Sequence, residues 1–176
     1  GSGVAVVGML TGRNLKSLVQ LYERLPAESA MRVAQLVHFA CAPDALPVLA
    51  EILNSPGIDL RDYLSQAALG ALVKTGTPYA AAVLARRLDR ATTPEDEATL
   101  SHALSSVYQS GTENELIAIA QGKQDATRAA TRVGAIRALA NYPISQVRGA
   151  LQELATDRDP QIALAAAHVL DSFTAP

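Results

Sequence analysis

A helical pattern that recurs four times, at a spacing of 34 to 35 residues, constrains the fold of this chain more than any other feature. Each occurrence combines a short apolar helix, a turn, a longer Ala-rich helix and a Pro or Gly. A fixed period in this range is typical of repeat proteins, in which neighbouring helix pairs stack to bury faces that one pair leaves exposed. The recurring segments are DALPVLAEIL, TPYAAAVLARRL, TENELIAIA and PISQVRGALQELA, with Leu49, Leu84, Ile119 and Leu154 in step.

The amino-acid composition agrees with an all-helical fold. Hydrophobic residues make up 49% of the 176 residues but aromatic residues only 4%, as in helix interiors built from Ala and Leu. No segment combines an alternation of period two with β-branched enrichment, so we expect no sheet. The length suits one domain and no linker is evident, so residues 4–176 are predicted to form a single domain.

The first ten residues are interpreted separately from the repeats. The opening Gly1-Ser2-Gly3 resembles the remnant of an expression tag, and we expect residues 4–176 to be a segment of a larger bacterial polypeptide. The apolar run from Val4 to Leu10 is much shorter than the roughly 20 residues that cross a bilayer. It is therefore interpreted as a helix or capping segment, without membrane insertion.

The last predicted helix, residues 160–173, has little polar face. Terminal repeats of a solenoid normally carry a polar outer face that keeps them in solution. Three explanations stay open: a following segment covers this helix, the helix packs on another chain in a homo-oligomer, or small Ala side chains are harmless when exposed.

Capping chemistry predicts where helices begin. A side-chain oxygen just before Pro can accept a hydrogen bond from the first helical turn, where Pro itself is well tolerated. Thr112 and Glu115 have the spacing of a capping box, in which each side chain accepts from a backbone N–H. The dipeptides that combine a capping residue with a following Pro are Thr77-Pro78, Thr93-Pro94 and Asp159-Pro160.

Helix ends are indicated by Gly57, Gly76, Gly111 and Gly122, and by Asn141 before Pro143, because Gly and Asn favour the left-handed backbone that ends a helix. Together these signals predict ten helices in five antiparallel pairs. Their expected ranges are 14–24 with 27–41, 44–53 with 59–75, 78–89 with 94–109, 113–121 with 126–141, and 144–156 with 160–173.

Residues 126–170 resemble HEAT repeats of the short bacterial type, including the subgroup found in phycobilisome lyases. The resemblance rests on Arg132, on the segment AIRALA at 135–140, on a turn with Pro, and on Asp157-x-Asp159-Pro160. The second pair matches through Pro47 and the segment AALGAL at 67–72. About residues 27–173 are covered.

The resemblance implies a right-handed α-solenoid of about five stacked antiparallel helix pairs, of the armadillo-like kind. The family's basic residue early in the second helix is Ser65 in the second pair and Ala163 in the fifth. These departures put in doubt a continuous ladder of Asp and Arg side chains joining the repeats.

The residues that could support catalysis are few. His38, His102 and His168 occupy different places within their repeats and are not expected to converge. The sequence has no His-Glu dipeptide of the kind that holds di-iron in HEAT-type enzymes, no metal-ligand spacing of His or Cys and no Gly-rich phosphate loop. The lone Cys41 excludes an internal disulfide and is interpreted as a small buried hydrophobe. We therefore expect no enzyme, no metal and no cofactor.

Charge argues against a nucleic-acid partner. The formal net charge is −2, and Lys and Arg are not gathered into a phosphate-binding stripe. Neutral surface composition is compatible with a bacterial cytoplasm or a periplasm, and the localisation stays open.

Helical wheels of three second helices predict a groove. Residues 59–75 would bury Leu60, Leu64, Ala68 and Leu72, residues 94–109 would bury Leu100, Ala103, Leu104 and Val107, and residues 126–141 would bury Ala129, Val133, Ile136 and Ala140. The opposite faces are either a polar groove for a peptide or protein, or plain solvated surface. The candidate partner-binding residues are Asp62, Gln66, Glu95, His102, Gln109, Arg128 and Thr131.

These observations predict a non-catalytic scaffold that binds a protein or peptide through the concave face of the solenoid. A chromophore-lyase-like protein that cradles a tetrapyrrole is the first alternative, and it requires an aromatic-lined cleft. A structural module that self-assembles through its apolar end helices is the second.

Overall fold

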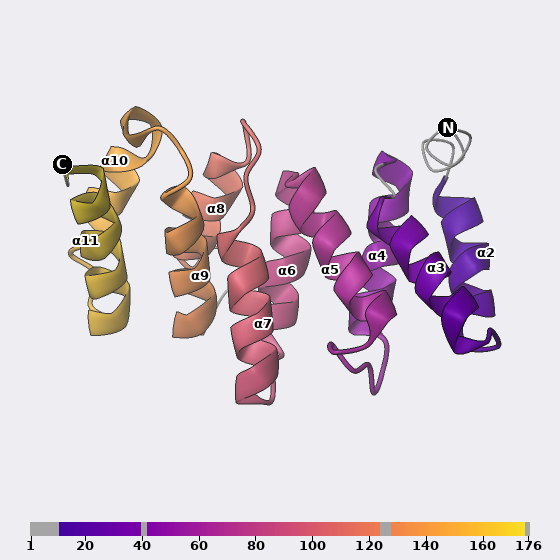
Figure 1. The fold of residues 1–176 in the computed structure, drawn as a ribbon. Coiled ribbons are helices and arrows are strands. Elements are labelled where there is room, and N and C mark those ends of the chain that lie inside the picture. The colour runs from indigo at the N-terminus through magenta and orange to yellow at the C-terminus, as the bar shows by residue number, and fades with distance from the viewer. Residues whose placement is uncertain (1–10, 40–41, 124–127, 175–176) are drawn as a thin grey trace. The chain divides into compact units, whose positions relative to one another are not determined.

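The structure is a computed structural model that describes residues 11–39, 42–123 and 128–174. These residues form ten α-helices, one short 3-10 helix and no strand, which confirms the all-helical prediction (Figure 1). Each of the ten predicted ranges overlaps one helix. The elements are α2 (Gly12–Tyr22), α3 (Ala27–His38), η1 (Pro43–Ala45), α4 (Leu46–Asn54), α5 (Tyr63–Thr75), α6 (Pro78–Asp89), α7 (Pro94–Ser105), α8 (Glu113–Ala120), α9 (Ala129–Leu139), α10 (Ile144–Leu154) and α11 (Pro160–Thr174).

Some sequence predictions fall outside the described residues. These are the helix or capping segment from Val4 to Leu10, the buried position of Cys41 and the start of the predicted helix at 126–127.

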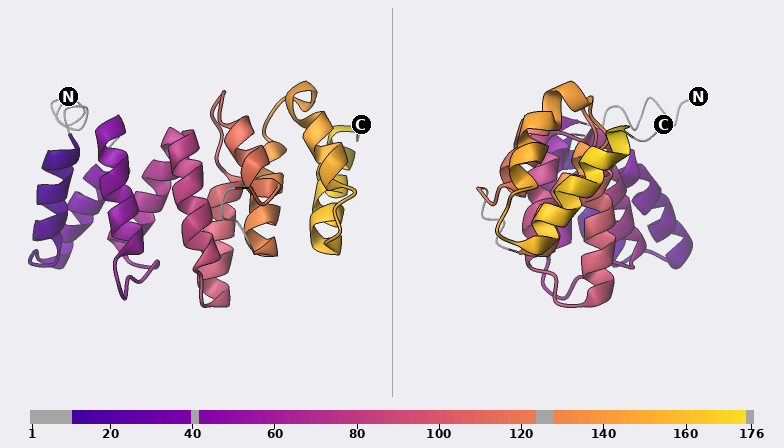
Figure 2. Two further views of the ribbon diagram at one scale, coloured as in Figure 1. Left: turned by 180° about the vertical axis from the view of Figure 1, so that it is seen from behind. Right: turned by 90° about the vertical axis from the view of Figure 1, so that its left-hand side faces the viewer.

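The chain divides into two compact units, residues 1–75 and 76–176. In unit 1, α2 packs against α3 and α4, and α5 packs against α3 and α4. In unit 2, α6, α8 and α10 are neighbours in one layer, and α7, α9 and α11 are neighbours in the other. Figure 1 shows this second layer of unit 2 in front, and Figure 2 shows the unit from behind. Within each unit, therefore, first helices lie beside first helices and second helices beside second helices.

The residues that the repeat places in step are all buried. Leu49, Leu84, Ile119 and Leu154 are at most 3% exposed, each on the first helix of its pair. All four positions therefore face the core of the unit in which they lie.

Three of the predicted helix starts are confirmed by their hydrogen bonds. Thr77 Oγ1 accepts from Ala80 N–H at 3.1 Å and Thr93 Oγ1 accepts from Asp96 N–H at 3.1 Å. At the start of α11, Asp159 Oδ1 accepts from Gln161 N–H at 2.9 Å. All four predicted glycine stops have positive φ angles, at Gly57, Gly76, Gly111 and Gly122.

The capping-box prediction for Thr112 and Glu115 is wrong. Thr112 makes no side-chain capping hydrogen bond and is fully buried. Its hydroxyl instead donates to the carbonyl oxygen of Gly76, 36 residues earlier, at 2.6 Å. A buried carbonyl without a partner costs about 1–3 kcal/mol, so this contact takes precedence over a cap that solvent can replace.

Arg132 joins consecutive helix pairs in unit 2. Its Nε donates to the carbonyl of Ala120 at 2.8 Å, and its Nη2 pairs with Asp157 Oδ2 at 2.6 Å. Ser65 of α5, at the position that the predicted repeat aligns with Arg132, is fully buried, and its hydroxyl has no hydrogen-bond partner among the described residues. An Arg-to-Asp link of this kind is therefore absent at the position of Ser65.

Asp157 should make the stability of unit 2 sensitive to acid. The pKa of the Asp157 carboxyl lies below its usual range. The main cause is the hydrogen bond that Asp157 accepts from Asp159 N–H, and the second is its contact with the Arg132 guanidinium. A lowered folded-state pKa stabilises the fold above about pH 4, and this contribution is lost as the pH falls through the folded pKa. Urea denaturation from pH 7 downward should therefore show Asp157→Asn less stable than the native chain at neutral pH, with the gap closing in acid. Asp171→Asn, on the exposed end of α11, is the matched control. A stability difference between Asp157→Asn and the native chain that does not change with pH would contradict a lowered pKa of Asp157.

Candidate functional site

Two of the three helical wheels are confirmed. The residues predicted to face the core from 59–75 and 94–109 are all less than 9% exposed, including Leu60, which lies before the start of α5 at Tyr63, and Val107, just beyond the end of α7. Five candidate partner-binding residues belong to these two predicted helices. Gln66, Glu95, His102 and Gln109 are exposed, and Asp62 is half-buried. Gln109 lies beyond α7, which ends at Ser105 rather than at residue 109.

The wheel for α9 is wrong. Ala129 and Val133 are half-buried and Ala140 is exposed, whereas Thr131 is fully buried. The Thr131 hydroxyl donates to Asp89 Oδ1 at 2.6 Å, so its burial leaves no polar group without a partner. Thr131 is therefore part of the packing between helices and not of an open surface.

Arg128 is also placed differently from its prediction. Its Nη1 donates to the carbonyl oxygens of Leu88 and Ala91, at 3.0 Å each, and its Nη2 pairs with Glu97. The last carbonyls of a helix have no partner within the helix. Arg128 binds the Leu88 carbonyl in the last turn of α6 and the Ala91 carbonyl just beyond the helix, and its ion pair with Glu97 fastens this end to α7, so Arg128 stabilises the fold.

A hollow of about 590 Å³ nevertheless opens on the layer of second helices in unit 2. We call it the α7–α9–α11 groove. None of the seven predicted partner-binding residues lines it. Its walls are Glu97 and Ser101 of α7, Ala130, Val133 and Arg137 of α9, and Gln161, Leu164, Ala165, His168 and Val169 of α11.

The groove residues were detectable in principle by their spacing. Glu97 and Ser101 are four apart, and Ala130, Val133 and Arg137 are three and four apart, so each set forms one face of its helix. These faces lie between the core stripe and the fully exposed side. A helical wheel that contrasts only buried with exposed residues does not single out a face of this kind.

The chemistry of the groove is mixed. Arg137 is exposed, and no described residue forms an ion pair with it. Glu97 is already paired with Arg128. Leu164 is 73% exposed beside the smaller Ala165 and Val133. The groove therefore offers, next to apolar surface, a guanidinium that no described residue pairs with, which suits a ligand with an anionic group beside an aliphatic one.

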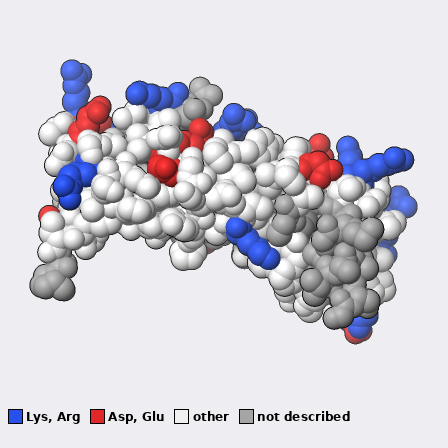
Figure 3. All heavy atoms as spheres, turned by 90° about the horizontal axis from the view of Figure 1, so that it is seen from above, with Lys and Arg blue, Asp and Glu red and all other residues white. Residues whose placement is uncertain are grey.

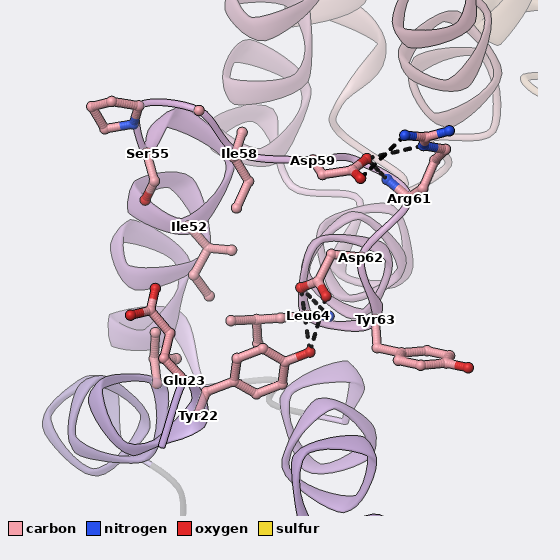
Figure 4. A pocket seen from close by; sticks show the side chains of 13 residues that line it. Tyr22, Glu23, Ile52, Ser55, Ile58, Asp59, Arg61, Asp62, Tyr63 and Leu64 are labelled. Atoms are coloured by element: carbon pink, nitrogen blue, oxygen red, sulfur yellow. Dashed lines mark hydrogen bonds and ion pairs between the residues drawn. The ribbon is translucent and has the colours of Figure 1, made fainter. Parts of the chain in front are cut away.

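A second hollow, of about 900 Å³, lies within unit 1. We call it the α2–α5 pocket (Figure 4). It is lined by residues of α2 and its end, of α4, of the loop after α4 and of the start of α5: Val19, Tyr22, Glu23, Ile52, Ser55, Pro56, Gly57, Ile58, Asp59, Arg61, Asp62, Tyr63 and Leu64. Asp62 is the one predicted partner-binding residue in either hollow. The Tyr22 hydroxyl donates to the two Asp62 carboxylate oxygens at 3.2 and 3.3 Å. Burial, and then the charge of Asp62, raises the pKa of the Tyr22 phenol, so the phenol remains a donor at neutral pH.

Other kinds of site find little support in the described parts of the chain. No three His, Cys, Asp or Glu residues there are gathered closely enough to hold a metal ion. Among the same residues, no helix has the length and apolar character needed to cross a membrane. On the face that Figure 3 shows, charged side chains of both signs are scattered over a largely uncharged surface.

Comparisons with protein-family models, with curated proteins and with solved structures give no match to this chain.

Proposed function

We propose that this chain is a non-catalytic HEAT-like solenoid that binds a segment of another protein in the α7–α9–α11 groove. The observation that carries the proposal is the groove itself, since three consecutive second helices contribute to one hollow. Stacked second helices form the binding surface in repeat proteins of this type. The buried in-step residues and the layered packing within each unit support the repeat architecture.

The groove specifies the chemistry of its partner. Arg137 lacks an ion-pair partner among the described residues, and its planar guanidinium favours a carboxylate. Leu164 and Val133 provide apolar contact, while Ala130 and Ala165 leave room for a backbone to approach. The expected partner is a peptide segment in which Asp or Glu lies next to an aliphatic residue.

The other two hypotheses gain less from the groove. No Tyr or Phe lines it, so it lacks the aromatic walls that a tetrapyrrole cradle requires. Self-association would place the exposed Leu164 against a second copy, and it is distinguished from peptide binding by the dependence of molecular mass on concentration.

Charge reversal of Arg137 tests the proposal. Partners are captured from lysate of the source organism with the immobilised chain, identified by mass spectrometry, and the binding segment is measured as a synthetic peptide by calorimetry. Arg137→Glu should weaken this peptide about tenfold or more, because it sets like charges against each other. The control Arg148→Glu reverses an exposed charge on α10, outside the groove, and should leave the affinity unchanged. Equal effects of the two variants would contradict binding in the groove.

A further inference from the structure

The α2–α5 pocket combines an apolar floor with an acidic rim. Its floor consists of Val19, Ile52 and Leu64, and Leu64 is 6% exposed. Three carboxylates and one guanidinium line it, a formal net charge of −2. The pocket is therefore acidic, whereas the lining of the α7–α9–α11 groove, with one Glu and one Arg, has no formal net charge.

One cation cannot balance the three carboxylates of this lining. Arg61 forms an ion pair with Asp59, in which Nε lies 3.2 Å from Oδ1. Asp62 accepts hydrogen bonds from the Tyr22 hydroxyl and from Leu64 N–H, both of which are neutral donors. The Glu23 carboxylate is exposed and has no ion pair among the described residues. With one cation against three carboxylates, the lining keeps two excess negative charges, and Glu23 and Asp62 are the carboxylates other than the Asp59 that Arg61 contacts.

These two carboxylates lie on opposite sides of the pocket. Figure 4 shows Glu23 on one side and Asp62 on the other, with the Tyr22 ring and Ile52 between them. A bare metal ion needs several oxygen ligands around one point, and the described residues provide no such group. A long side chain with a cationic end fits better, because its stem can contact the apolar floor while its charge reaches the rim. The Tyr22 ring adds an aromatic surface of the kind that attracts cations.

We infer that the α2–α5 pocket binds a Lys or Arg side chain, flanked by apolar residues, of a partner polypeptide. This site is independent of the proposed groove in unit 2, since it uses other residues and ligands of opposite charge.

The test is an NMR titration of the ¹⁵N-labelled full chain with the capped peptide acetyl-Ala-Leu-Lys-Leu-Ala-amide. Saturable shifts are expected for the backbone amides of Tyr22, Ile58 and Leu64. The matched peptide with norleucine at the centre should bind about tenfold more weakly, because it keeps the apolar stem and loses the charge. Raising the ionic strength to about 1 M, where the Debye length is about 3 Å, should weaken the binding of the Lys peptide and leave the binding of the norleucine peptide nearly unchanged.

Two variants locate the binding. Glu23→Gln should weaken the binding of the Lys peptide about threefold, since it removes one exposed charge and no described hydrogen bond. Asp62→Asn should weaken it as well, and the amide oxygen can still accept from Tyr22. Glu51→Gln removes an exposed carboxylate of α4 that does not line the pocket, and it should have no effect.

Several results would overturn the inference. These are equal binding of the Lys and norleucine peptides, no saturable shift up to about 1 mM peptide, or equal effects of Glu23→Gln and Glu51→Gln. The same shifts produced by magnesium chloride alone would identify a metal site instead. The same shifts produced by concentrating the protein without peptide would identify a second copy as the occupant.

Discussion

Leu104→Asp is expected to abolish the cooperative folding of unit 2. Leu104 is fully buried in α7, and its Cδ2 lies 3.2 Å from the position that a β-carbon on Gly134 of α9 would occupy. An Asp there leaves a cavity and places a carboxylate in an apolar core without a partner. The combined cost is about 4 kcal/mol or more, a large part of the 5–15 kcal/mol that stabilises a typical domain.

Chemical denaturation followed by circular dichroism measures this loss, and hydrogen exchange of the backbone amides locates it. Exchange should rise in α7 and α9, which pack against each other. Leu104→Met is the control, because it keeps volume and apolarity and should cost less than about 1.5 kcal/mol. An unchanged denaturation midpoint for Leu104→Asp would mean that this face of α7 does not pack against α9.

Gly76→Ala is expected to have the second-largest effect. Gly76 has a φ of +60°, and a β-carbon there would lie 2.7 Å from the carbonyl oxygen of Tyr108. The left-handed conformation costs a non-glycine residue about 1–2 kcal/mol, and relieving the clash adds about 1–3 kcal/mol. Any shift of Gly76 also strains its hydrogen bond from the buried Thr112 hydroxyl. The free energy of unfolding should fall by about 2–5 kcal/mol, measured by urea denaturation.

Gly111→Ala separates the two contributions. Gly111 also has a positive φ, of +99°, but no atom lies within 4 Å of the position of its β-carbon. Its replacement should cost only the conformational term of about 1–2 kcal/mol. Equal losses for Gly76→Ala and Gly111→Ala would show that close packing against Tyr108 contributes nothing.

Features encoded by neighbouring residues were predictable from the sequence. A Thr or Asp before Pro supplies both the capping oxygen and a favoured first residue, so the starts of α6, α7 and α11 followed from short motifs. The wheels of α5 and α7 were correct because large aliphatic residues on one face contrast with polar residues on the other.

Features decided by distant partners were not predictable. In α9, Ala and Gly occur on every side, so the wheel has little contrast, and the burial of Thr131 depends on Asp89, 42 residues away. Arg128 is placed by the carbonyls at the end of α6, and Tyr22 meets Asp62 across 40 residues. The groove likewise depends on how neighbouring helices are rotated about their axes, which no single helix specifies.

The α7–α9–α11 groove as a protein-binding surface is the central claim, and site-specific photo-crosslinking tests it most directly. A benzophenone amino acid is introduced at Leu164, within the groove, and separately at Gln152, which is exposed on α10 outside it. After irradiation in cells of the source organism, Leu164 should crosslink a defined protein through a segment that contains Asp or Glu beside an aliphatic residue, and Gln152 should not. Crosslinking of the same protein from Gln152 alone, or of no protein from Leu164, would contradict the claim.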